Sequence, residues 1–168
     1  IEELTLADPG PGEIRVRIAG AGICHTDSLV RIPGFFPLPI VLGHEGAGVV
    51  EVVGEAVEDI RVGDHVVLSF DSCGHCEWCD GHLPSYCTEF FRRNSTGRRL
   101  DGTTGLTDTG GEPVGSRFFG QSSFASHVLA TARNAVVIDP ALPLEIMGPL
   151  GCGFLTGAGT VLNALDVQ

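Results

Sequence analysis

Four cysteines within a short stretch carry the strongest chemical signal in the sequence. Cys73, Cys76, Cys79 and Cys87 follow the spacing Cys-x2-Cys-x2-Cys-x7-Cys. Thiolate sulfur is a preferred ligand of zinc, and structural zinc sites take four ligands in a tetrahedron. Three cysteines two residues apart can wrap one ion in a tight turn, and the fourth follows a short insertion. The spacing predicts a closed, four-cysteine zinc site in a lobe at about residues 71–92.

Two other interpretations of this stretch remain. The four cysteines could be disulfide-bonded or simply buried, but a secreted disulfide framework spreads its cysteines to link distant segments. His75 and His82 lie in the same stretch and could be ligands. Since four cysteines already complete the tetrahedral shell, we expect both histidines at the surface.

The two remaining cysteines indicate a second site. Cys24 follows a predicted strand, His44 precedes one, and Cys152 stands between two glycines at the start of the last predicted helix. Taken singly, each cysteine is typical of a small buried hydrophobic residue. Two thiolates and one imidazole together would make a three-ligand zinc site. Its fourth position would be open, as a catalytic zinc needs for water or substrate.

Composition excludes several classes of function. The chain of 168 residues has a formal net charge of −11, which argues against nucleic acid or an anionic membrane surface as partner. Apolar runs fall short of the ~20 residues of a membrane helix. The acidic start lacks a signal peptide, and its first residue is not Met, so we expect the native N-terminus to be missing. Thiolate metal sites without an export signal predict a reducing cytoplasm.

The elements that must position these residues are mostly short strands between Gly- and Pro-rich turns. Alternating apolar residues predict a strand at 13–18 that continues extended to residue 23. Further strands are expected at 49–53, 64–70, 123–130 and 135–138. A short helix at 28–32, capped by Thr26 or Asp27, a helical turn within 140–150 and a helix at 153–165 complete the prediction. The pattern indicates a mainly β fold with some α: a β-barrel-like core with a C-terminal helical segment.

The stretch 92–117 is poor in large apolar residues and holds five of the ten arginines. We expect a long, solvated surface excursion. A phosphate-binding patch is the alternative.

The motifs together resemble the zinc-dependent medium-chain alcohol dehydrogenases. The matching segments are 22–27 (Gly-Ile-Cys-His-Thr-Asp), 43–50 (Gly-His-Glu-Gly-Ala-Gly-Val-Val), 62–66, the four-cysteine stretch, and 151–157. They run in family order from about residue 13 to the end. The resemblance implies a single catalytic domain over residues 1–168 with the GroES-like fold, a partly open β-barrel.

The resemblance also implies roles for the metal ligands. This family is the standard example of a catalytic zinc held by two cysteines and one histidine, so that role for Cys24, His44 and Cys152 is implied rather than worked out. Glu45 would lie behind the ligands and act at times as a ligand itself. The four-cysteine stretch would hold a structural zinc, giving two zinc ions per chain.

Proton and cofactor roles follow from the same resemblance. Asp27 would accept the free N–H of His44, and Thr26 would take the proton of the alcohol. His25 would lie near the cofactor pyrophosphate and could also serve the reaction. Many relatives carry another His two residues after the Asp, where this chain has Leu29, so the proton route beyond Thr26 would pass through His25 or water.

The implied activity is oxidation of an alcohol to an aldehyde, with hydride transfer to NAD(P). The Rossmann unit that binds this cofactor, with its Gly-x-Gly-x-x-Gly turn, is not found in the sequence. We therefore expect a truncated catalytic domain, inactive without its cofactor domain, of an enzyme that is a homo-oligomer at full length. Phe35 and Phe36 could line a pocket for an aryl or allylic alcohol or serve plain packing. A glutathione-linked enzyme that acts on formaldehyde is an alternative that shares much of this pattern.

Two other functions compete with this one. The first is a standalone zinc-binding module without redox chemistry. The second is a nucleic-acid-binding zinc ribbon, which usually pairs two distant Cys-x2-Cys knuckles and does not suit a single cluster in an acidic chain.

Overall fold

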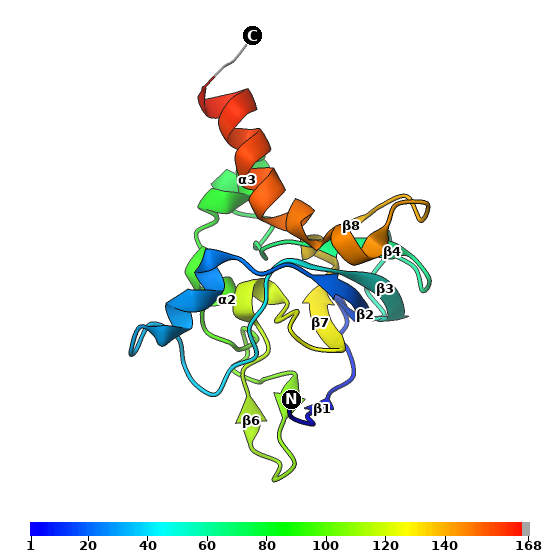
Figure 1. The fold of residues 1–168 in the computed structure, drawn as a ribbon, viewed down its shortest axis with the longest axis vertical. Coiled ribbons are helices and arrows are strands. Elements are labelled where there is room, and N and C mark those ends of the chain that lie inside the picture. The colour runs from blue at the N-terminus through cyan, green and yellow to red at the C-terminus, as the bar shows by residue number, and fades with distance from the viewer. Residues whose placement is uncertain (166–168) are drawn as a thin grey trace.

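The computed structural model describes residues 1–165, so the predicted domain end at Gln168 lies outside the described residues. A five-stranded antiparallel sheet, in the order β7-β2-β3-β4-β8, forms the body. It curls into a half-barrel, with α3 leaving from one side (Figure 1). Its strands are β2 (Glu13–Ala21), β3 (Gly46–Val53), β4 (His65–Leu68), β7 (His127–Thr131) and β8 (Ala135–Val137).

The curl follows from strand β2. Ile14 and Val16 are fully buried, whereas Arg15 and Arg17 point away from the core. The β2–β3 register shifts between Arg15 and Val16 and again between Ile18 and Gly20, and such bulges bend a strand. The bend wraps the sheet around one apolar core.

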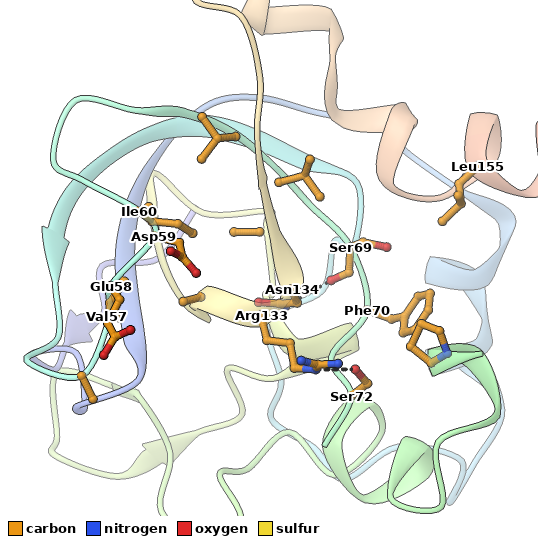
Figure 2. Close-up of a pocket in the computed structure, with 16 residues that line it drawn as sticks. Val57, Glu58, Asp59, Ile60, Ser69, Phe70, Ser72, Arg133, Asn134 and Leu155 are labelled. Atoms are coloured by element: carbon orange, nitrogen blue, oxygen red, sulfur yellow. Dashed lines mark hydrogen bonds between the residues drawn. The ribbon is translucent and has the colours of Figure 1, made fainter. Parts of the chain in front are cut away.

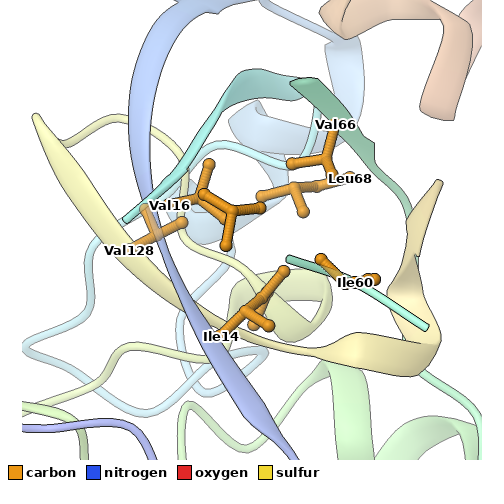
Figure 3. Packing of buried hydrophobic residues seen from close by; sticks show 8 residues of the cluster. Ile14, Val16, Ile60, Val66, Leu68 and Val128 are labelled. Carbon is orange, nitrogen blue, oxygen red and sulfur yellow. The ribbon is translucent and has the colours of Figure 1, made fainter. Parts of the chain in front are cut away.

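That core gathers aliphatic side chains from four strands and one loop (Figure 3). Burying one such side chain completely contributes roughly 1.5–3 kcal/mol. Its buried members are Ile14, Val16, Val50, Ile60, Val66, Leu68, Val128 and Ala130.

The strand predictions hold except at their ends. The strand expected at 64–70 is limited to His65–Leu68, and the one expected at 123–130 begins only at His127. Ser122 has a φ of 55°, a left-handed backbone conformation that a strand does not accommodate. Beyond it, the N–H groups of Ser123 and Phe124 donate to the backbone oxygens of Gly43 and Leu42, and the chain bends over 124–126 before the strand begins.

The excursion 92–117 was wrongly predicted as a solvated loop. It includes the end of α2 (Phe90–Asn94) and the strands β5 (Leu106–Thr107) and β6 (Pro113–Val114). With β1 (Thr5–Leu6), β5 and β6 form a second, three-stranded sheet in the order β1-β5-β6. Arg99 and Arg117 both bind the Glu13 carboxylate, and Arg93 binds Asp71. Internal carboxylates thus occupy three of the five arginines that were considered for a phosphate, and the other two, Arg92 and Arg98, bind backbone oxygens.

The first helix differs from its prediction at its start. A 3-10 helix, η1, spans His25–Arg31 and begins three residues earlier than expected. Its N-cap is therefore Cys24 rather than Thr26 or Asp27. Asp27 lies inside the first turn, where its Oδ2 accepts a hydrogen bond from the backbone N–H of Cys24 at 2.9 Å. The carboxylate stabilises the helix start from within.

The C-terminal segment is helical, as predicted. Two 3-10 turns, η5 (Leu144–Ile146) and η6 (Gly148–Gly151), precede α3 (Gly153–Gly159), which continues as a π-helical turn, η7 (Thr160–Ala164). The remaining short helices are α1 (Glu77–Asp80), η2 (Pro84–Tyr86), η3 (Phe118–Gly120) and η4 (Ala132–Asn134). Within residues 1–165, every helix is too short or too polar to cross a bilayer.

Candidate metal centres

The four cysteines predicted to bind zinc converge. The Sγ atoms of Cys73, Cys76, Cys79 and Cys87 all lie within 4.8 Å of one another. Those of Cys73 and Cys79 are 3.8 Å apart, close to the ~3.8 Å edge of a tetrahedron whose Zn–S bonds are ~2.3 Å. All six cysteines are free, so the disulfide interpretation is wrong for the described residues. The geometry fits a zinc ion.

The protein supports charge on these sulfurs. Backbone N–H groups of Cys73 and Glu89 donate to Cys87 Sγ at 3.2 and 3.4 Å. Hydrogen bonds from the backbone of Thr88 and Cys79 lower the pKa of Cys76 to about 5, whereas burial raises the pKa of Cys87 to about 11. One thiol is ready to ionise and another is not. A cation at the centre would make all four ionise.

The two histidines of this stretch stand outside the cluster. His75 and His82 are both exposed. His75 Nδ1 lies 2.9 Å from the backbone oxygen of Cys73, so its ring folds back on the chain. The four cysteines alone form the converging group.

A second group brings together Cys24, His44, Glu45 and Cys152, whose donor atoms also lie within 4.8 Å of one another. The pairing of β2 with β3 explains why Cys24 and His44 lie close together. Ala21 at the end of β2 pairs with Gly46 at the start of β3, so the residues just beyond these ends meet. The Gly22 N–H donates to the Glu45 oxygen at 2.9 Å and extends the pairing toward Cys24 and His44.

Cys152 reaches the same point through glycines. A Cβ on Gly148 would overlap the backbone oxygen of Glu45, and one on Gly151 would overlap that of Leu68. The segment before Cys152 therefore lies directly on the backbone of Glu45, just before β3, and of Leu68 in β4, which only glycine permits. Ser69 Oγ donates to the Gly151 oxygen at 2.7 Å and fastens this contact.

Asp27 connects the first two candidate ligands. Asp27 is only 6% exposed, and its Oδ2 accepts a hydrogen bond from the Cys24 N–H. Its Oδ1 accepts a hydrogen bond from the Gly43 N–H at 3.1 Å and lies 3.1 Å from His44 Nδ1. Because a carboxylate only accepts, the His44 proton belongs on Nδ1. Nε2 of His44 is then a bare acceptor. It is buried and has no hydrogen-bond partner among the described residues.

An unpartnered buried nitrogen beside two thiols fits a metal ion. Leaving such an atom unsatisfied costs roughly 1–3 kcal/mol, and coordination removes that cost. Burial, and then the charges of Cys24 and Glu45, raise the pKa of Cys152 to about 12. Three acidic groups crowded in one place favour a cation, and zinc prefers this sulfur and nitrogen set.

Glu45 lies behind this group. Its side chain is buried, and Oε1 accepts a hydrogen bond from the Gly153 N–H at 3.2 Å, at the start of α3. Its Oε2 lies where a Cβ on Gly22 would be. Glu45 therefore joins the strand ends to the helix that follows Cys152.

Gly22→Ala is expected to disturb this site because the new methyl group overlaps the Glu45 carboxylate. We expect zinc affinity at the Cys24 site to fall ~10–100-fold, the usual effect of moving a group that orients ligands. Chelator competition would measure it. Gly12→Ala is the matched control, since nothing lies within 4 Å of its Cβ. Equal zinc affinity in both variants would contradict this role of Gly22.

The other predicted site residues lie near the group. Thr26 is half-buried in the first turn of η1, and His25 beside it is exposed. Phe36 is buried and packs edge-to-face on Phe118 with ring centroids 5.0 Å apart, whereas Phe35 is 53% exposed. Phe36 thus serves packing, and Phe35 reaches the surface.

Sequence reasoning missed the segment that lies against His44. The centroid of the Phe119 ring is 4.8 Å from that of the His44 ring, and the centroid of the Phe118 ring is 5.6 Å from it. Phe119 has a φ of 49° and Gly120 one of 74°, so the chain turns sharply here. The next residue, Gln121, is fully buried. Only the glycine signals a turn, and nothing in the sequence indicates what it contacts.

A cavity of about 790 Å³ does not coincide with either metal group. Its lining runs from the 56–60 loop past the end of β4 to Leu155 of α3, and within it Arg133 Nε donates a hydrogen bond to Ser72 Oγ at 3.1 Å (Figure 2). No candidate zinc ligand lines it. This cavity is therefore separate from both candidate metal sites.

Comparison with known proteins agrees with this geometry. Residues 10–140 match the family described as the alcohol dehydrogenase GroES-like domain. A geraniol dehydrogenase from Castellaniella defragrans is 52% identical over 169 residues, which cover 99% of this chain and 45% of that protein.

Two solved structures are similar throughout. An alcohol dehydrogenase zinc-binding domain protein from Burkholderia ambifaria gives a TM-score of 0.97 at 50% identity, covering 100% of this chain and 46% of that one. The benzyl alcohol dehydrogenase from Acinetobacter calcoaceticus gives a TM-score of 0.91 at 44% identity, and the match covers 98% of this chain and 44% of that one.

The chain therefore spans less than half the length of these relatives. The mainly β half-barrel and the order of the motifs agree with the family match, which extends over more than half of the sequence. The resemblance seen in the sequence is confirmed: the chain belongs to the alcohol dehydrogenase GroES-like domain family.

Proposed function

We propose that this chain is the zinc-binding catalytic domain of an alcohol dehydrogenase that oxidises an alcohol to an aldehyde with hydride transfer to NAD(P). The observation that carries the proposal is the buried Nε2 of His44, which has no hydrogen-bond partner within residues 1–165 and lies next to the thiols of Cys24 and Cys152. Three ligands leave one tetrahedral position open. An open position distinguishes a catalytic site from the closed four-cysteine site.

A zinc ion held by these three residues would act as a Lewis acid that lowers the pKa of a bound alcohol. The residues of the chain supply the rest. Asp27 keeps the His44 proton on Nδ1, which leaves Nε2 free to bind metal. Glu45 keeps the start of α3, and so Cys152, against the strand ends.

Thr26 is the residue that we assign to proton transfer. It lies two positions after the ligand Cys24, in the half-buried first turn of η1. Its hydroxyl accepts the proton of the substrate and passes it outward. With Leu29 in place of a second histidine, the exposed His25 or water completes the route. We also place His25 beside the cofactor pyrophosphate.

The substrate that we favour is an aryl or allylic primary alcohol. Support comes from the names of two relatives, a geraniol dehydrogenase and a benzyl alcohol dehydrogenase. NAD(P) would bind to a Rossmann domain beyond this chain, in an enzyme that we expect to be a homo-oligomer. The six free cysteines suit a reducing cytoplasm.

The activity test uses the chain joined to its cofactor domain, with geraniol or benzyl alcohol and NAD⁺ or NADP⁺. We expect NAD(P)H to form. Thr26→Val should lower kcat ~10²–10⁴-fold, the usual contribution of a positioned acid–base group, while Thr26→Ser keeps the hydroxyl and most of the rate.

The competing function is a standalone zinc-binding module. It predicts bound zinc and no NAD(P)H formation by the joined protein with any alcohol. That result would overturn the proposal, whereas an active enzyme with equal rates for Thr26→Val and Thr26→Ser would overturn only the role of Thr26.

A further inference from the structure

Gln121 occupies an unusual place beside the Cys24 site. Its side chain is fully buried and makes three hydrogen bonds to backbone groups. Its Oε1 accepts from the Gly46 N–H at 3.0 Å, and its Nε2 donates to the His44 oxygen at 2.9 Å and to the Ser69 oxygen at 3.2 Å. One amide thus holds the backbone on both sides of Glu45.

The orientation of this amide is unambiguous. The opposite orientation would set the NH2 group against a backbone N–H and the oxygen against two carbonyl oxygens. A buried amide with all of these bonds lost would cost several kcal/mol. The contacts therefore define a single position for the side chain.

Ser69 extends the connection to the third ligand. The backbone oxygen of Ser69 accepts a hydrogen bond from Gln121. The Ser69 hydroxyl donates to the backbone oxygen of Gly151, one residue before Cys152, at 2.7 Å. A continuous path thus runs from His44 through Gln121 and Ser69 to Cys152. Asp27 makes the corresponding connection between Cys24 and His44.

We propose that Gln121 is a positioning residue that sets the separation of His44 and Cys152 through Ser69, and thereby the geometry and affinity of the Cys24–His44–Cys152 metal site. The inference rests on the proposed function, since it assumes a metal at that site. It assigns a role to a residue far along the chain, reached through the left-handed turn at Phe119 and Gly120.

Asn94 provides a matched control. It is an equally buried amide that bridges backbone groups: its Oδ1 accepts from the Asp71 N–H at 2.8 Å, and its Nδ2 donates to the oxygens of Asp71 and Phe90 at 2.9 and 2.8 Å. Asp71 leads into the four-cysteine stretch rather than the Cys24 site. Asn94→Leu therefore removes the same chemistry from the other centre.

The experiment compares Gln121→Met and Asn94→Leu after metal removal and reloading with Zn²⁺ or Co²⁺. Gln121→Met should weaken Zn²⁺ at the Cys24 site ~10–100-fold and shift the Co²⁺ ligand-field bands of that site, which Cys24→Ser identifies by their loss. The four-cysteine bands should stay unchanged. Asn94→Leu should leave the Cys24-site bands unchanged.

Ser69→Ala keeps the test decisive if Gln121→Met fails to fold. It removes only the bond to Gly151 and should shift the same bands in the same direction by a smaller amount. The inference would be overturned if Ser69→Ala and folded Gln121→Met both left the bands and the zinc affinity of the Cys24 site unchanged. It would also be overturned if Asn94→Leu changed that site as much as Gln121→Met does. A wild-type chain that binds metal only at the four cysteines would overturn the proposed function as well.

Discussion

Cys76→Ser and Cys24→Ser are expected to remove different zinc ions, and only Cys76→Ser is expected to unfold part of the chain. The four-cysteine lobe has α1, four residues long, and the short turn η2 as its only regular structure before α2. Zinc binding to such a site supplies roughly 10–16 kcal/mol of folding free energy. The Cys24 site instead lies on strands that a large apolar core already holds.

Metal analysis and limited proteolysis would test this expectation. The wild-type chain should hold two zinc ions and each variant one, and only Cys76→Ser should become cleavable within residues 71–92. His75→Ala is the control and should retain both ions, because His75 is exposed and outside the cluster. Loss of the same ion from both cysteine variants would rule out two separate sites.

Glu13→Gln is expected to cost about 3–5 kcal/mol of unfolding free energy, because breaking a buried ion pair leaves a charge unpaired. Glu13 is 8% exposed and binds both Arg99 and Arg117, and Arg117 is itself 4% exposed. The pair ties β2 to the excursion 92–117. Urea denaturation of both proteins at neutral pH would measure the loss.

The same pair predicts a pH dependence with a definite sign. Burial acts to raise the pKa of Glu13, but the hydrogen bond from Arg99 and the charge of Arg117 outweigh it and lower the pKa below 4.5. A lowered pKa means that the stabilisation is complete above pH ~4.5 and is lost as the pH falls through the folded-state value. Glu13→Gln should lack this acid-side loss.

Glu51→Gln is the comparison for both measurements. Glu51 also faces two arginines, Arg15 and Arg17, but its side chain is 33% exposed. An exposed pair contributes ~0–1 kcal/mol. A loss in Glu13→Gln no larger than that in Glu51→Gln would show that burial adds nothing to the Glu13 pair.

The sequence was sufficient for the features that depend on local spacing or periodicity. The alternation around Ile14 and Val16 predicted β2, and the cysteine spacing predicted the convergence from Cys73 to Cys87. Cys24 and His44 came together as expected because strand ends paired in antiparallel register have to meet. These features depend only on residues that are neighbours along the chain or across one pair of hydrogen-bonded strands.

The features that were missed depend on contacts between distant segments. Arg117 gives no sign in the sequence that it is buried, because its partner Glu13 lies 104 positions away. The contact of Gln121 with His44 depends on the left-handed turn at Phe119 and Gly120, and the glycine that signals this turn does not indicate which distant residue the turn contacts. The start of η1 was misplaced because Asp27 stabilises it from inside the first turn rather than as its cap.

The placement of the two metal groups along the chain has a consequence for the order of assembly. Cys73 and Cys87 are 14 positions apart, whereas Cys24 and Cys152 are 128 apart, so the second loop costs about 2 kcal/mol more to close. The four cysteines can capture zinc in a chain that is still largely unfolded. The other site has to wait for β2, β3 and β4 to pair. Zinc would therefore bind first at the four cysteines that hold the lobe and last at the Cys24 site.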